Sequence, residues 1–222
     1  MRVGLIGDVH AEDAKLETVR AYFRDTADCV WCTGDIVDGT GDPSRCAELL
    51  SSNAAVVVRG NHDRWYMCGE ARSLPYATKT GSLHSEAQLW LYKLPATLTI
   101  ETPAGPVLLC HGIGEDDMAT FMPHHYGYAL EVNDVLRRVV GSGRWPIVVA
   151  GHTHRRMVRE VGFTTWINVG TLRADHGPTF GILDTDALSV QFFDFGAENR
   201  ILPSEEIGIR KSAAEPSNGA AA

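Results

Sequence analysis

Short apolar runs alternate with amphipathic segments through the first part of the chain. The runs cover residues 2–6, 28–33 and 55–59. Between them, residues 12–25 repeat apolar side chains at helical spacing, and residues 43–52 open with a proline that follows an aspartate. Proline is favoured in the first turn of a helix and aspartate as its cap. This strand–helix–strand–helix–strand order predicts a buried parallel sheet covered by helices.

The second part of the chain is less regular. We expect helices over 83–93 and 128–140, a hairpin over 97–101 and 106–110, and further strands over 146–150, 163–169, 179–184 and 188–195. A length of 222 residues favours one domain over two. We place that domain at residues 1–202. Residues 203–222 are rich in Ser, Glu, Ala and Gly, which predicts a flexible C-terminal tail.

Composition narrows the functional class. The hydrophobic fraction of 44% is ordinary for a globular protein, and no apolar run is long enough to span a membrane. Lys and Arg total 20 against 28 Asp and Glu, so the net charge is −8, which disfavours nucleic acid as a partner. An odd count of 5 cysteines, with an N-terminus that turns polar too early for a secretory signal, predicts a cytoplasmic protein.

Polar clusters follow the apolar runs at the point where each run ends. They read Gly7-Asp8-Val9-His10, Gly34-Asp35-Ile36-Val37-Asp38, Gly60-Asn61-His62-Asp63, His111-Gly112 and Gly151-His152-Thr153-His154. One such cluster is typical of a turn, but a series of them in order is not. The carboxyl ends of parallel strands meet at one edge of a sheet, where ligands bind. We therefore expect these side chains to converge.

The donors in these clusters are oxygen and imidazole nitrogen, without a thiolate. Such a set favours divalent Mn, Fe, Ni, Co or Zn. If Asp35 is shared, the clusters supply two groups of four ligands. Two cations about 3.5–4 Å apart, bridged by a carboxylate, can hold a phosphoryl group and activate a hydroxide. The sequence thus predicts a dinuclear metal centre, with manganese among its candidate ions.

These five blocks resemble the signature of the calcineurin-like metallophosphoesterase superfamily, in particular its small bacterial phosphodiesterase branch. The resemblance extends from residue 7 to residue 154 in its motifs. It implies an α/β fold in which a two-sheet β sandwich is flanked by helices, as four αββα layers. It also implies a metal-dependent hydrolase.

The resemblance assigns roles residue by residue. One metal would be held by Asp8, His10, Asp35 and His154, and the second by Asn61, His111 and His152 together with Asp35. His62 would be the catalytic histidine, which protonates the leaving group or binds a phosphate oxygen. Asp38 would orient it, because a carboxylate on the second nitrogen fixes an imidazole. Asp63 either supports the site or caps a loop or helix.

The chain departs from the family pattern at two places. Gly39 stands where the protein Ser/Thr phosphatases carry an arginine that binds phosphate, so this chain lacks that arginine. Arg64 and Arg155 flank the motifs and are candidate substrate-binding residues, although each could be an ordinary surface charge. Asn168-Val169-Gly170-Thr171 replaces the family's late Asn-Pro-Gly-Ser, and we expect it to form a turn near the metal loops.

We therefore expect a phosphodiesterase that cleaves a small-molecule or nucleotide phosphoester. The alternatives are a phosphomonoesterase or protein phosphatase, a nuclease, and a non-catalytic scaffold such as the superfamily's retromer subunit. The scaffold resemblance predicts a gap in the histidine set, and none is present. The sequence does not decide whether the protein forms a homo-oligomer. It also does not decide whether the 113–128 segment and Trp65-Tyr66 shape the substrate pocket. We take His176 to be a surface residue.

Overall fold

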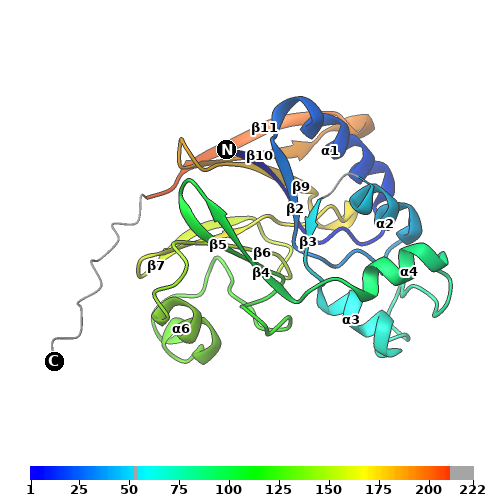
Figure 1. Cartoon of the computed structure of the whole chain (residues 1–222), viewed down its shortest axis with the longest axis horizontal. Coiled ribbons are helices and arrows are strands. Elements are labelled where there is room, and N and C mark those ends of the chain that lie inside the picture. The colour runs from blue at the N-terminus through cyan, green and yellow to red at the C-terminus, as the bar shows by residue number, and fades with distance from the viewer. Residues whose placement is uncertain (53–54, 211–222) are drawn as a thin grey trace, which may run out of the picture.

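The computed structural model describes residues 1–52 and 55–210. It contains two sheets, and Figure 1 shows them packed against each other with helices outside both. The first sheet has the order β11-β10-β9-β1-β2-β3. Its strands are β1 (Arg2–Ile6), β2 (Cys29–Cys32), β3 (Val56–Val57), β9 (Thr179–Asp184), β10 (Ser189–Phe195) and β11 (Ile201–Gly208).

The second sheet has the order β4-β5-β6-β8-β7. Its strands are β4 (Thr97–Thr102), β5 (Gly105–Cys110), β6 (Ile147–Ala150), β7 (Met157–Val161) and β8 (Thr164–Asn168). The helices are α1 (Asp13–Thr26), α2 (Pro43–Ser51), α3 (Asn61–Cys68), α4 (Ser85–Tyr92), α5 (Tyr128–Glu131) and α6 (Asp134–Gly141). In Figure 1, α1, α2 and α4 lie together beyond the first sheet, and α6 lies on the side of the second.

The hydrophobic core follows these layers. One buried cluster joins the first sheet to the helices above it and includes Ile6, Leu16 and Phe23. A second cluster fills the space between the sheets and includes Leu5 and Trp31. A third joins the second sheet to α6 and its flanking loops. Strand β1 lies inside the first sheet, and its residues from Val3 to Ile6 are buried on both faces, so its sequence is a continuous apolar run rather than an alternating one. The expected sandwich with flanking helices is confirmed.

Each sheet contains a parallel set of strands that carries the polar clusters. Strands β1, β2 and β3 run parallel, as do β5, β6 and β8. The neighbouring strands β9, β10, β4 and β7 pair antiparallel, so the sheets are mixed. The carboxyl ends of β1, β2, β3, β5 and β6 therefore lead into the site described below.

Two local expectations differ from the structure. The helix expected over 128–140 is divided into α5 and α6, because the Asn133 side chain accepts a hydrogen bond from the Leu136 backbone N–H at 3.0 Å and starts a new helix. The expectation also omitted β7 and the helix α3 that follows Gly60.

The cap of α2 is as expected, with the Asp42 side chain accepting hydrogen bonds from the backbone N–H groups of Ser44 and Arg45.

The domain boundary expected at residue 202 lies too early. Residues 203–208, assigned to a flexible tail, belong to β11, which pairs antiparallel with β10. Ile209 then packs into the cluster between the sheets with 7% of its surface exposed. Most β11 side chains face solvent, so the strand lacks the apolar pattern that would reveal it. Residues 211–222 of the expected tail lie outside the described residues.

No helix within the described ranges has both the length and the apolar character needed to cross a bilayer.

Candidate metal centre

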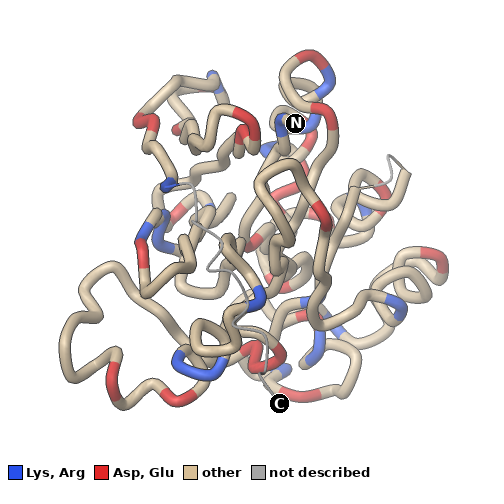
Figure 2. The backbone as a smooth tube through the Cα atoms, turned by 60° about the vertical axis from the view of Figure 1, so that its left-hand side comes forward, with Lys and Arg blue, Asp and Glu red and all other residues tan. Residues whose placement is uncertain are grey.

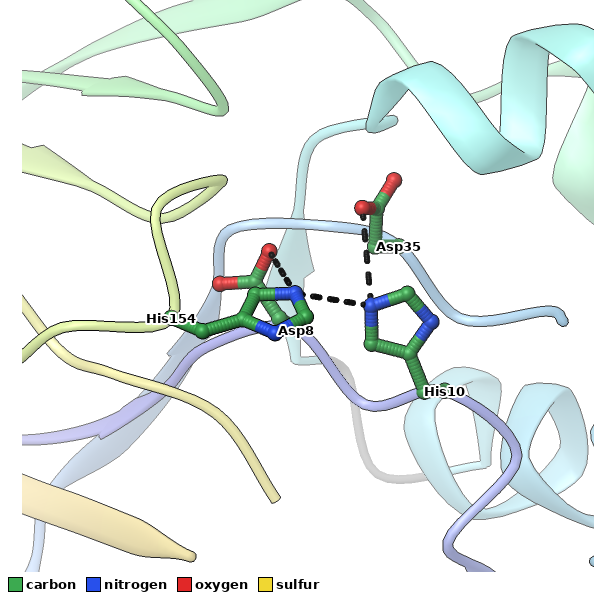
Figure 3. A group of neighbouring side chains, drawn as sticks. All are labelled: Asp8, His10, Asp35 and His154. Carbon is green, nitrogen blue, oxygen red and sulfur yellow. Dashed lines mark hydrogen bonds and ion pairs between the residues drawn. The ribbon is translucent and has the colours of Figure 1, made fainter. Parts of the chain in front are cut away.

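The first group of expected ligands comes together from three separate loops. Asp8 and His10 follow β1, Asp35 follows β2 and His154 follows β6 (Figure 3). Their ligand atoms all lie within 4.8 Å of one another. His10 Nε2 is 3.0 Å from His154 Nε2 and 3.8 Å from Asp35 Oδ2, and His154 Nε2 is 3.6 Å from Asp8 Oδ1. Both carboxylates are almost completely shielded from solvent.

The second group lies on the other side of Asp35. His111 Nε2 is 2.9 Å from Asn61 Oδ1 and 3.2 Å from Asp35 Oδ2. His152 Nδ1 is 3.0 Å from the same Asn61 oxygen. Asp35 thus faces histidines of both groups, His10 on one side and His111 on the other. The structure brings together all the side chains that the sequence analysis named as ligands.

The backbone around these ligands is unusually shaped. Positive φ angles between 47° and 66° occur at His10, Asp35, Asp38, His152 and His154. Residues other than glycine adopt this left-handed region infrequently, with Asp and His among the more tolerant. Glycine allows the close approach of neighbouring loops, since a Cβ added to Gly60 would lie 2.1 Å from Asp35 Oδ1. Such local strain is concentrated at functional sites in proteins.

Hydrogen bonds to the ring nitrogens fix how two of the histidines face the site. His10 Nδ1 donates to the Asp38 carbonyl at 2.9 Å, and His111 Nδ1 donates to the Thr33 carbonyl at 2.7 Å. In the neutral ring, Nε2 then carries the lone pair. Both Nε2 atoms face Asp35 in a buried space, so each presents a lone pair there whenever its ring is neutral. Converging lone pairs and carboxylates need a cation, so the donor set fits divalent metals.

The ionisation of the buried groups points the same way. Burial raises the pKa of Asp8 to about 7. Burial opposes a charged His111, but the neighbouring Asp35 and Asp8 carboxylates raise its pKa to about 10. Burial lowers the pKa of His10 to about 4, so its ring is neutral near pH 7. Near pH 7 the His111 ring therefore carries a proton, and the Asp8 carboxyl group is close to its own pKa.

His62 lies at the rim of the centre, with 21% of its side chain exposed. Its Nδ1 donates to Asp38 Oδ2 at 2.8 Å, which is the contact that the sequence analysis expected. Burial lowers the pKa of His62, but the hydrogen bond to Asp38 and the charge of Asp35 outweigh it, so the net shift is upward.

Asp63 is a structural residue at the start of α3. It is fully buried, and its carboxylate accepts the backbone N–H groups of Ile36, Val37 and Gly60. It thereby ties the loop after β2 to the start of the helix, as the capping alternative predicted. The Asn168–Thr171 turn has the expected place too. The Asn168 side chain donates to the Gly151 carbonyl, and the Thr171 hydroxyl donates to the Asp8 carbonyl.

Sequence reasoning missed two side chains that support the site. Arg72 donates to both carboxylate oxygens of Asp38, at 2.8 and 2.9 Å. His176 is exposed, as expected, but its Nδ1 lies 2.6 Å from His154 Nδ1, a contact that the sequence did not suggest. Arg72 lies in an irregular segment and His176 ends a short 3-10 helix (Ala174–His176), 34 and 22 positions from their partners, and no periodicity or motif connects them.

The candidate substrate-binding residues differ in their surroundings. Arg64 forms a two-bond ion pair with Asp117, at 2.7 and 2.9 Å. Arg155 follows His154, is exposed, and has no acidic partner within the described part of the chain. It lines a cavity of about 480 Å³ beside His154 and His176.

Tyr66 is 2% exposed and packs in the core, so it is not available to stack on a ligand.

Comparisons with known proteins place the fold in a family. A model described as the calcineurin-like phosphoesterase superfamily domain matches residues 1–188. The uncharacterized protein MJ0912 of Methanocaldococcus jannaschii is 32% identical over 96 residues. That match covers 41% of this chain and 36% of MJ0912, so it spans about a third of that curated relative.

Solved structures share the fold at low identity. A metallophosphoesterase from Sphaerobacter thermophilus has a TM-score of 0.65 and 24% identity, over 86% of each chain. A novel archaeal phosphodiesterase has a TM-score of 0.54 and 20% identity, over 93% of this chain and 99% of that one. Vacuolar protein sorting 29 from Cryptosporidium parvum has a TM-score of 0.57 and 20% identity, over 93% and 97%.

Cation binding should release protons near pH 7. The metal-free site holds protons at Asp8 and His111, whose pKa values are raised to about 7 and about 10. A cation must displace them, so its apparent affinity should rise as the pH increases through about 7. Calorimetric titration with Mn²⁺ in two buffers of different ionisation enthalpy measures the released protons. An affinity that stays constant from about pH 6 to about pH 8 would contradict this account.

Proposed function

The chain belongs to the calcineurin-like phosphoesterase superfamily, and we propose that it is a metal-dependent phosphodiesterase acting on a small-molecule or nucleotide phosphoester. Family membership supports a hydrolase with a metal centre. One observation carries the finer proposal: a group of buried and partly buried candidate ligands borders His62, which is hydrogen-bonded to Asp38 and partly exposed.

We assign two cations to the centre. Asp8, His10, Asp35 and His154 would hold one, and Asp35, Asn61, His111 and His152 the other. The distances of Asp35 to His10 and His111 support its role as the shared ligand. The oxygen and imidazole donors suit Mn, Fe, Ni, Co or Zn. Bound there, such cations supply Lewis-acid polarisation of the phosphoester and an attacking water of lowered pKa.

The proposed role of His62 and Asp38, at the rim of the site, is to protonate the leaving group. His62 directs Nδ1 to Asp38, which leaves Nε2 without a hydrogen-bond partner in the described structure. We propose that Nε2 protonates the leaving oxygen, a step that commonly contributes about 10²–10⁴-fold. Asp38 fixes the tautomer of His62 and stabilises its protonated form. The upward shift of the His62 pKa is consistent with a proton donor near neutral pH.

The charges around the centre favour a diester over a monoester. A phosphomonoester carries nearly two negative charges at pH 7, because its second pKa is about 6. A diester carries one. Arg64 is paired with Asp117, which leaves Arg155 as the substrate contact that we propose. At position 39, a Cβ would lie 1.7 Å from the His10 carbonyl oxygen, so this backbone has no room for the arginine of the protein phosphatases.

Other activities have less support. The likeness to vacuolar protein sorting 29 raises a protein-binding role, but at 20% identity it concerns the fold alone. The intact His62 and ligand set favour an enzyme. A nuclease is disfavoured by the net charge of −8. Figure 2 shows Lys and Arg positions interspersed with Asp and Glu along the backbone, rather than gathered in a continuous basic stripe.

The substrate class is tested by a comparison of esters. We expect faster hydrolysis of bis-p-nitrophenyl phosphate than of p-nitrophenyl phosphate, with Mn, Ni, Fe, Co and Zn supplied in turn. Cyclic nucleotides then test the nucleotide alternative. Measured kcat/KM values give the preference directly. A consistent preference for the monoester with every metal would replace our proposal by a phosphomonoesterase.

Replacing the shared ligand should affect both cations. Asp35→Asn removes a charge that faces both ligand groups, so metal content should fall at both positions. His154→Ala should affect one position only, and its loss of activity should be smaller. Asp134→Asn removes an exposed carboxylate and serves as the matched control. Metal analysis and calorimetry measure the stoichiometry. Full metal content and turnover in Asp35→Asn would exclude the bridging role.

Removing the proposed proton donor should separate chemistry from metal binding. His62→Ala should retain its metals and lose about 10²–10⁴-fold in kcat on alkyl diesters, with a smaller loss on p-nitrophenyl diesters. An acidic phenol needs little protonation when it leaves, whereas an alkoxide needs a great deal. The exposed His84→Ala is the control. Equal losses on both leaving groups would instead indicate that His62 binds a phosphate oxygen.

A further inference from the structure

The segment between α3 and α4 reaches the site through one arginine. Residues 69–84 contain no helix or strand. From this segment, Arg72 extends to Asp38, and only 17% of its side chain is exposed. Its guanidinium lies 5.9 Å from the ring centre of Tyr66, a core residue. The Arg72 side chain therefore points into the protein, where its charge is paired with the Asp38 carboxylate.

The donors of Arg72 are almost fully used. Nη1 donates to Asp38 Oδ1 at 2.8 Å and to the Thr78 carbonyl at 3.1 Å. Nη2 donates to Asp38 Oδ2 at 2.9 Å, and Nε donates to the Glu70 carbonyl at 2.6 Å. A guanidinium has five N–H groups, of which these contacts occupy four. It therefore has little capacity left to bind a phosphate, and two of its four hydrogen bonds go to the Asp38 carboxylate.

Asp38 needs this support, because its backbone has a φ of 66° and its carboxylate must stay in one orientation to hold His62. The Thr78 backbone N–H donates to Asp38 Oδ1 at 2.7 Å, and the Thr78 hydroxyl accepts from the Asp38 backbone N–H at 2.9 Å. Arg72 adds a planar contact to both carboxylate oxygens. Such paired bonds fix the plane of a carboxylate, which a single point charge does not.

We propose that Arg72 is a positioning residue for the proton transfer by His62, acting through Asp38 and tying the 69–84 segment to the catalytic rim. The inference rests on the proposed phosphodiesterase function. Within the described residues, the hydrogen bonds of Arg72 go to Asp38, Thr78 and Glu70, none of which is a proposed metal ligand. It holds the Asp38 carboxylate in the plane that directs the Nε2 atom of His62 to the leaving oxygen.

The kinetic test uses Arg72→Met, which keeps the length of the side chain and removes its donors. We expect kcat on alkyl diesters to fall about 10–100-fold, the usual effect of losing such a supporting contact. The loss on p-nitrophenyl diesters should be much smaller, with KM and metal content unchanged. In the His62→Ala background, Arg72→Met should cost little more, because residues acting as a unit share one loss. Arg45→Met removes a surface arginine paired with Glu17 and Glu48 and is the control.

A spectroscopic readout is independent of turnover. In ¹⁵N-histidine-labelled protein, the Nδ1 proton of His62 should give a downfield resonance, assigned by its absence in His62→Ala. We expect this resonance to weaken or disappear in Arg72→Met and to persist in Arg45→Met. If Arg72→Met does not fold, Arg72→Lys replaces it, since one ammonium cannot span both oxygens of Asp38.

The outcomes separate this inference from the proposed function. A wild-type protein that cleaves no diester with any metal contradicts the function, while the resonance still tests Arg72. An unchanged His62 resonance in Arg72→Met overturns the positioning role. Equal losses on both leaving groups, or losses that add fully to those of His62→Ala, overturn it too and assign Arg72 to stability alone.

Discussion

Two carboxylates, Asp8 and Asp35, are buried side by side, and the rest of the site depends on neutralising them. Removing a carboxylate from water costs several kcal/mol unless positive charge or hydrogen bonds compensate. The backbone N–H groups of His152 and His62 donate to Asp8 and Asp35. These bonds compensate only in part, since burial still raises the pKa of Asp8. The rest of the negative charge must be balanced by positive charge, and the surrounding imidazole nitrogens face the space where a cation would bind.

Holding so many ligands together needs a backbone that ordinary loops do not adopt. Left-handed conformations at residues such as Asp35 and His154 cost of order 1–3 kcal/mol each. Tight loop contacts add to this, as at Gly60, where no side chain fits beside Asp35. These costs are tolerated because the loops emerge from two sheets anchored by three buried hydrophobic clusters. The core thus stabilises a site that is locally unfavourable.

Function depends on the side chains added to this frame rather than on the frame itself. Proteins with the same fold include a phosphodiesterase and a vacuolar sorting protein. In this chain, the guanidinium groups of Arg64 and Arg72 are both paired with carboxylates, those of Asp117 and Asp38.

The sequence by itself determined the elements that have local signals. Apolar runs ending in Gly with Asp, Asn or His marked the strands and the candidate ligands, because each cluster directly follows its strand in the chain. The contacts made by Arg72 and His176, and the strand β11, were decided only by the tertiary structure. Arg72 meets Asp38 across 34 positions, and β11 is held by pairing with β10 rather than by an apolar pattern. Short motifs in the sequence indicate which side chains are candidate ligands. The contacts that orient those side chains, and the pairing of the edge strand β11, involve segments that meet only when the chain is folded.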